Sequence, residues 1–211
     1  GDQVPIAFIG VWDTVATSIS APAAAWAVPD TAANVVHCLA LDEMRTLFAP
    51  TLLSYAQAQA PNVKEVWFPG AHSDVGGGYF HDGLSRVTLK FMWQNWNAAL
   101  AVQNLTPLNW NDAAVAQATD TTGQPPVLHS EAGSLTGRLG GNSPRACATF
   151  DGKPPRLHPS VESYVQQGGL LFCAEKDGFP PDDPVVGIVY QPAAYPGAAG
   201  VVAYDSTSWP A

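Results

Sequence analysis

Two long apolar runs and one intervening helical pattern organise the first third of this chain. The run Val4–Trp12 is apolar almost without interruption, which is typical of a strand covered on both faces of a parallel sheet, so we expect a central strand. Val63–Phe68 predicts the next strand. Between them, residues 30 to about 48 predict a helix with an Asp-Thr cap and with Val35 and Leu39 on one stripe. This order predicts a right-handed crossover that makes the two strands parallel neighbours.

The helical pattern is clearest in the middle of the chain and decays afterwards. Thr51–Ala60 predicts a short helix, and Leu84–Leu100 predicts a longer, core-packing helix. Beyond residue 101 the chain is rich in Pro, Gly, Asn and Thr, which indicates loops, with a short helix at Ser160–Gln167 and a short strand at Val185–Tyr190. We expect one domain over residues 1–211, of the α/β class, with a mostly parallel sheet, helices on both faces and a loop-rich C-terminal region.

Both predicted strands end in a polar residue that can do acid–base chemistry. Asp13 follows the first run, and His72 follows the second, 72 − 13 = 59 residues later. Parallel strands place their carboxyl ends at one edge of a sheet, so the two side chains can meet as the acid and the base of a hydrolase triad. The structural alternatives are a strand-end turn at Asp13 and a loop histidine satisfied by backbone at His72.

A glycine-rich turn follows this histidine. Glycines 76 to 78 allow backbone dihedrals that side chains forbid, so the chain can turn sharply beyond the imidazole. Asp74 competes with Asp13 as partner of the ring, and Asp74, Gly76 and Gly77 are candidate supporting residues. A metal site at His72 and Asp74 would lack a clear third ligand, so we expect no metal and no other cofactor.

Several sequence blocks resemble a family of α/β-hydrolase-like proteins that includes bacterial type VI secretion phospholipase effectors of the Tle1 type and many fungal relatives. They occur here in the family's order between about residues 5 and 195: FIGVWDTV, HCLALDEMRTLFAP, VWFPGAHSDVGGGY, LSRVTLKFMW and LHPSV. The resemblance implies a partial α/β-hydrolase-like fold, with Asp13 as the triad acid and His72 as the base. It also implies an ester or lipid substrate, with phospholipid as the family's best-known case.

The chain departs from this family at the nucleophile. In the family a G-x-S-x-G-like motif lies upstream of the FIGVWDTV block, and this chain begins just before that block. Ser143 is a poor substitute, because Pro144 follows it and has no N–H to lend to an oxyanion hole. Ser134 has the wrong glycine spacing, and Ser73 lies on the same loop as His72. We therefore expect the C-terminal portion of a hydrolase domain.

Two functional hypotheses remain open. In the first, the chain is the acid- and histidine-bearing part of a serine ester hydrolase, a lipase, phospholipase or esterase, completed by a second polypeptide that carries the serine and covers the first strand. Alone it would be inactive. In the second, it is a catalytically inactive binding or structural protein derived from the same fold.

The composition of the chain disfavours some classes of binding partner but does not identify a reaction. The net charge of −9 and the pI of about 4.7 disfavour nucleic acid, and no apolar run is long enough to span a membrane. Secretion is compatible with this sequence but not indicated by it. Cys38, Cys147 and Cys173 are expected to be ordinary thiols, although a bond between the last two is possible. Asp42 and Arg45 predict a surface ion pair.

Overall fold

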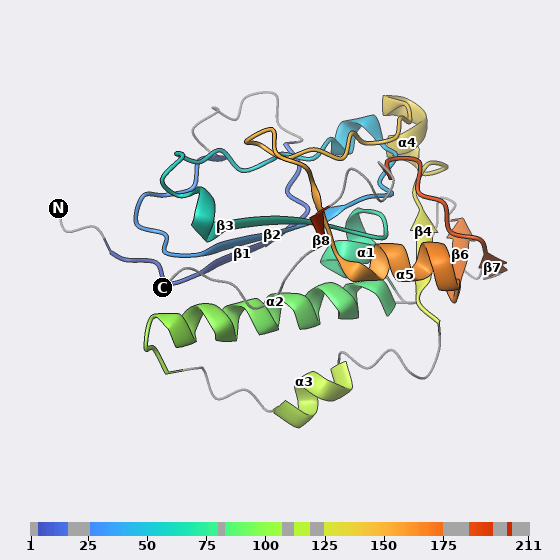
Figure 1. Cartoon of the computed structure of the whole chain (residues 1–211). Helices are drawn as coiled ribbons and strands as arrows, with labels where there is room; N and C mark the ends of the chain where they lie inside the picture. Colours follow the sequence, from blue (N-terminus) through green and yellow to red (C-terminus); the bar gives the residue numbers. More distant parts are fainter. Residues whose placement is uncertain are drawn as a thin grey trace.

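A parallel five-stranded sheet positions Asp13 and His72, the predicted acid and base (Figure 1). The computed structural model describes residues 4–16, 26–79, 83–106, 112–118, 125–174, 186–195 and 202–203. The strands, in spatial order, are β1 (Ile9–Trp12), β2 (Val35–Ala40), β3 (Val63–Phe68), β5 (Arg156–Leu157) and β8 (Val202–Ala203). All four pairings are parallel. The expected α/β class with a mostly parallel sheet is confirmed.

Helices and a smaller sheet surround this one (Figure 1). The helices are α1 (His72–Gly76), α2 (Gly83–Val102), α3 (Asp112–Ala118), α4 (Leu135–Gly140), α5 (Pro159–Gln167) and the 3-10 helices η2 (Thr46–Phe48) and η3 (Ala60–Asn62). The smaller sheet contains β4 (Val127–Ser130), β6 (Leu170–Ala174) and β7 (Val186–Ile188). The helices predicted at Leu84–Leu100 and Ser160–Gln167, and the short strand predicted at Val185–Tyr190, are thus confirmed.

The helix expected between the first two strands is wrong. Its middle is β2, all six residues of which are buried. A strand buried on both faces shows no alternation, so periodicity cannot separate it from a short buried helix. Thr51–Ala60 also lacks the expected helix, and only the short η3 begins at its end. Backbone groups there bond to distant chain, for example Thr51 N–H to the Thr14 carbonyl at 2.8 Å.

The order of strands also corrects the expected neighbours. β1 and β3 are parallel and lie in one sheet, but β2 lies between them, with Val11 beside His37 and His37 beside Glu65. β1 was expected to be central, yet among the described strands it pairs with β2 alone and stands at the edge. Its residues are only half-buried, whereas β2 and β3 are buried throughout.

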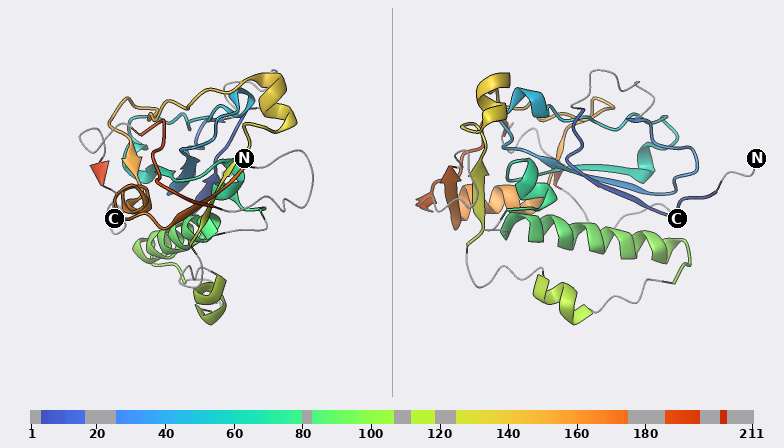
Figure 2. Two further views of the ribbon diagram at one scale, coloured as in Figure 1. Left: turned by 90° about the vertical axis from the view of Figure 1, so that its right-hand side faces the viewer. Right: turned by 180° about the vertical axis from the view of Figure 1, so that it is seen from behind.

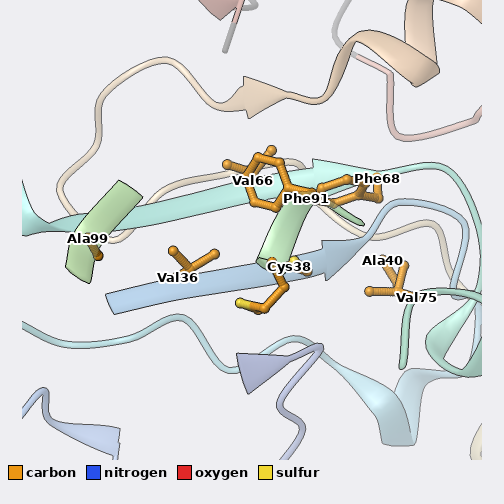
Figure 3. Close-up of a cluster of buried hydrophobic side chains, with 9 residues drawn as sticks. Val36, Cys38, Ala40, Val66, Phe68, Val75, Phe91 and Ala99 are labelled. Atoms are coloured by element: carbon orange, nitrogen blue, oxygen red, sulfur yellow. The ribbon is translucent and has the colours of Figure 1, made fainter. Parts of the chain in front are cut away.

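Helix α2 covers one face of the sheet, below it in Figure 1, as the views from the side and from behind in Figure 2 also show. Alternate residues of β2 and β3 point toward it and pack with its side chains and with Val75 of α1 (Figure 3). The members of this cluster are Val36, Cys38, Ala40, Val66, Phe68, Val75, Phe91, Met92 and Ala99.

The opposite face is covered in part by α5 and by the segment that follows β7. Leu39 and Trp67 pack there with Leu157, Val161 of α5 and Tyr190. The two clusters fix β2 and β3 from both sides, so the loops at the carboxyl ends of these strands start from rigid positions. The three cysteines are free thiols.

Candidate active site at the carboxyl edge of the sheet

The acid and the histidine predicted from the strand ends lie in contact. Asp13 directly follows β1, and His72 is the first residue of α1, four residues after β3 ends. Parallel pairing through β2 brings both strand ends to one edge, and His72 Nδ1 lies 2.8 Å from Asp13 Oδ2. The expected contact is therefore present, while the catalytic role of the pair stays a prediction.

Asp13 is held as an ionised, fully buried carboxylate. Its backbone has φ +38°, a conformation in which aspartate is one of the few tolerated side chains. The amide N–H of Ala40, at the end of β2, donates to Oδ1 at 2.8 Å. Burial acts to raise the pKa of Asp13, but hydrogen bonds from His72 and Arg145 and the charge of Arg145 outweigh it and hold the pKa below its usual value.

Arg145 is the strongest partner of this acid. Nη1 donates to Asp13 Oδ1 at 2.6 Å, and Nη2 donates to Oδ2 at 2.9 Å, which makes a bidentate pair. The same guanidinium donates to the carbonyl oxygens of Ala40 and Phe48, so it joins three loops at the sheet edge. The sequence does not point to Arg145 as a partner of Asp13, because nothing local links it to a carboxylate 132 residues away.

His72 is the part of the site that solvent reaches. Its side chain is 30% exposed, whereas that of Asp13 is fully buried. The ring of Phe48 packs edge-on against the imidazole with ring centroids 5.3 Å apart, and the backbone N–H of His72 donates to Glu43 Oε2 at 3.2 Å. With Nδ1 donating to Asp13, the tautomer leaves Nε2 as an acceptor. Among the described residues no hydrogen-bond partner of Nε2 is found.

Glu43 and Arg45 stabilise the segment that carries His72. Arg45 Nη2 donates to Glu43 Oε2 at 2.7 Å, and its guanidinium lies 3.6 Å from the centroid of the Phe48 ring. Burial acts to raise the pKa of Glu43, but the hydrogen bonds and the charge of Arg45 hold it below its usual value. The predicted surface pair of Asp42 with Arg45 is therefore wrong, since Arg45 is buried and pairs with Glu43 and Glu131.

Asp42 instead caps the turn after β3. It accepts the Gly70 N–H at 2.7 Å and the Tyr190 hydroxyl at 2.6 Å. Burial raises the pKa of Asp42 to about 7, against the opposing effect of these two hydrogen bonds, and nearby Asp74 adds to the increase. The carboxyl group thus titrates near neutral pH.

Asp74 serves a different histidine from the one beside it in sequence. Its Oδ1 lies 2.6 Å from His129 Nδ1, and its Oδ2 accepts the N–H groups of His129 and Ala71, each at 2.9 Å. Burial raises the pKa of Asp74 even though these contacts with His129 lower it. It therefore joins α1 to β4 rather than orienting His72.

The glycines that follow terminate α1. Gly76 is its last residue, and Gly77 has φ +87° and donates its N–H to the Ser73 carbonyl at 2.8 Å. A side chain at Gly77 would be strained in this conformation, so the sharp exit from the helix requires glycine there.

Ser134 and Ser143, two of the serines considered from the sequence, have no contact with His72 among the hydrogen bonds of the described residues. Ser134 is the N-cap of α4 and accepts the Gly137 N–H at 3.3 Å, and the hydroxyl of exposed Ser143 lies 3.5 Å from the Pro144 carbonyl. In the described part of the chain, no group of three or more metal-ligating side chains is found. None of the described helices is both long and apolar enough to cross a membrane.

Comparison with known families supports the resemblance for the N-terminal part. Residues 1–95 match the family described as the type VI secretion phospholipase effector Tle1-like catalytic domain. The match contains β1, β2, β3, α1 and more than half of α2, hence both Asp13 and His72. The later LHPSV block lies outside it. Comparisons with curated proteins and with solved structures gave no match.

Proposed function

We propose that this chain supplies the acid and the base of a serine ester hydrolase that acts on lipid esters. The observation that carries the proposal is the 2.8 Å contact between the buried Asp13 and the partly exposed His72, at the carboxyl edge of a parallel sheet. Asp13 fixes the tautomer and the orientation of the ring, and Nε2 takes the proton of a serine hydroxyl as that oxygen attacks the ester carbonyl. The imidazolium then gives the proton to the leaving alcohol.

The nucleophile belongs, in this proposal, to a serine-bearing segment outside these 211 residues. The side of β1 that no described strand pairs with supports such a segment. Alternate residues of a strand bond to alternate sides, and Ile9 and Asp13 donate their N–H groups toward β2. Gly10 and Trp12 therefore face the other side, along which no described strand pairs. A strand added there would end beside Asp13.

The lipid substrate rests on the family alone. Residues 1–95 match a phospholipase catalytic domain, and a fold match does not by itself fix the ester that is cleaved. The proposal therefore specifies a carboxylic ester with an apolar acyl group.

One observation favours the inactive alternative. Arg145 contacts both oxygens of Asp13, and a buried carboxylate that already has a full cationic partner also makes sense as a purely structural ion pair. In a scaffold protein the same contacts would hold three loops together, and His72 would be an inherited residue.

A fluorophosphonate probe separates these proposals. The 211-residue chain alone should show no labelled serine, while the protein isolated under native conditions should be heavier than 22.2 kDa and should carry the label on an associated segment. His72→Ala should abolish labelling, and Ser73→Ala, one residue away, should retain it. Labelling of Ser134 or Ser143 in the chain alone would identify another nucleophile. A native 22.2 kDa protein without label would favour the inactive scaffold.

A further inference from the structure

Three leucines are exposed on the side of the molecule formed by η2 and α4. Leu47 is 52% exposed, Leu135 57% and Leu139 78%. Leu135 and Leu139 are four residues apart on α4 and so share a face of the helix. Leu47 packs so closely against the end of α4 that a side chain at Gly140 would collide with it. We refer to Leu47, Leu135 and Leu139 as the leucine patch.

The leucine patch is continuous with the candidate active site. Leu47 precedes Phe48, whose ring contacts the His72 imidazole. Arg45, which begins this segment, donates from Nη1 to Thr136 of α4 at 3.3 Å and to Glu131 at 3.2 Å. Figures 1 and 2 show η2 and α4 side by side, on the side of the sheet opposite α2. The leucine patch is therefore linked to His72 through Phe48, and Arg45 joins the same segment to α4.

We propose that the leucine patch inserts into the surface of a neutral or zwitterionic lipid assembly and so brings His72 to the esters of that surface. This inference rests on the proposed hydrolase function. Exposed leucine side chains lose unfavourable contact with water when they enter an acyl layer. α4 itself adds one basic side chain, Arg138, and no acidic one. The net charge of −9 works against anionic lipid, so the surface it fits is uncharged overall.

Vesicle flotation tests the proposal without any catalytic step. The full chain is mixed with phosphatidylcholine vesicles, and bound and free protein are quantified. We expect the double variant Leu135→Ser/Leu139→Ser to lower the partition coefficient about tenfold or more, the equivalent of about 1.4 kcal/mol. The matched control is Leu89→Ser/Val102→Ser, which removes two side chains of 41% and 40% exposure from α2 and should leave binding unchanged. Phosphatidylglycerol in the vesicles should weaken binding at low ionic strength.

Several results would overturn the proposal. These are no binding of the unaltered chain to phosphatidylcholine, an equal loss in the α2 control, or preferred binding to the anionic vesicles. A dimer or a complex with a serine-bearing segment that dissociates in the α4 variant would show that protein, not lipid, covers the leucine patch. Circular dichroism of both variants confirms that each is folded. Because binding is read without hydrolysis, failure of the fluorophosphonate experiment is a separate outcome.

Discussion

The pair of Asp13 with Arg145 should be the most strongly coupled interaction at the sheet edge. Its two charge-assisted hydrogen bonds, of 2.6 and 2.9 Å, contribute about 1.5 kcal/mol each at the low end of the usual range. Both side chains are almost completely buried, so each single substitution leaves an uncompensated group. We expect Arg145→Met to lower the free energy of unfolding by about 3–5 kcal/mol and Asp13→Asn by a similar amount.

A double-mutant cycle isolates the pair from the other contacts of each residue. The double variant removes both charges together, so its loss should be smaller than the sum of the single losses by about 3 kcal/mol. Urea unfolding at pH 7, followed by tryptophan fluorescence, measures all four free energies. Arg138→Met on exposed α4 is the control and should cost less than about 1 kcal/mol. Additivity of the two single effects to within about 0.5 kcal/mol would refute the coupling.

The same cycle has a pH signature. The pKa of Asp13 is lowered in the folded state, so its contribution to stability is present above the unfolded pKa of about 3.9 and is lost as the pH falls through the folded value. Removing Arg145 removes one of the groups that lower this pKa. The acid unfolding midpoint of Arg145→Met should therefore move to higher pH, and an unchanged midpoint would contradict the assignment.

The remaining predictions concern Asp42, Asp74 and the partly buried His158, which caps the N-terminus of α5, and each variant is compared with the unaltered chain by urea unfolding. The folded pKa of Asp42 is raised to about 7, so stability should fall as the pH rises from about 4 to about 7, and Asp42→Asn should remove on the order of 1–2 kcal/mol of this dependence. Burial lowers the pKa of His158 to about 4, so stability should be lost as the pH falls from about 6.5 toward 4, and His158→Asn should reduce that loss. Asp74→Asn should lower the free energy of unfolding by about 2–4 kcal/mol, while fluorophosphonate labelling of the complete protein, counted per folded molecule, should persist. Loss of labelling in this variant, in which His72 is unchanged, would make Asp74 part of the catalytic site.

Local sequence carries some parts of this architecture and not others. Val63–Phe68 is a strand with the predicted bounds, and the apolar spacing after residue 83 does form α2. In both segments the apolar residues that gave the prediction are the ones that the structure buries. β2 was missed because a six-residue strand buried on both faces looks like one helical stripe. The strand order followed from that error, since an unrecognised strand cannot be placed between its neighbours.

The candidate site divides in the same way. Asp13 and His72 could be paired because each ends an apolar run, and parallel strands bring such ends together. Arg145 could not, because it lies in an irregular segment whose position depends on contacts with three separate loops. Arg45 pairs with Glu43 and not, as predicted, with Asp42. Burial decides this as well, because it raises the free-energy cost of any charge left without a partner.

The two partners of Asp13 bear directly on what His72 can do. A triad acid orients the imidazole and also stabilises the positive charge that forms on it, but Arg145 already balances most of the charge of Asp13. In the proposed hydrolase, orientation of the ring would therefore be the larger contribution of Asp13, and the 2.8 Å contact that provides it is already present in this chain. In the proposed hydrolase, the 30% exposure of the His72 side chain meets a second requirement, because a serine hydroxyl must be able to reach the histidine that takes its proton.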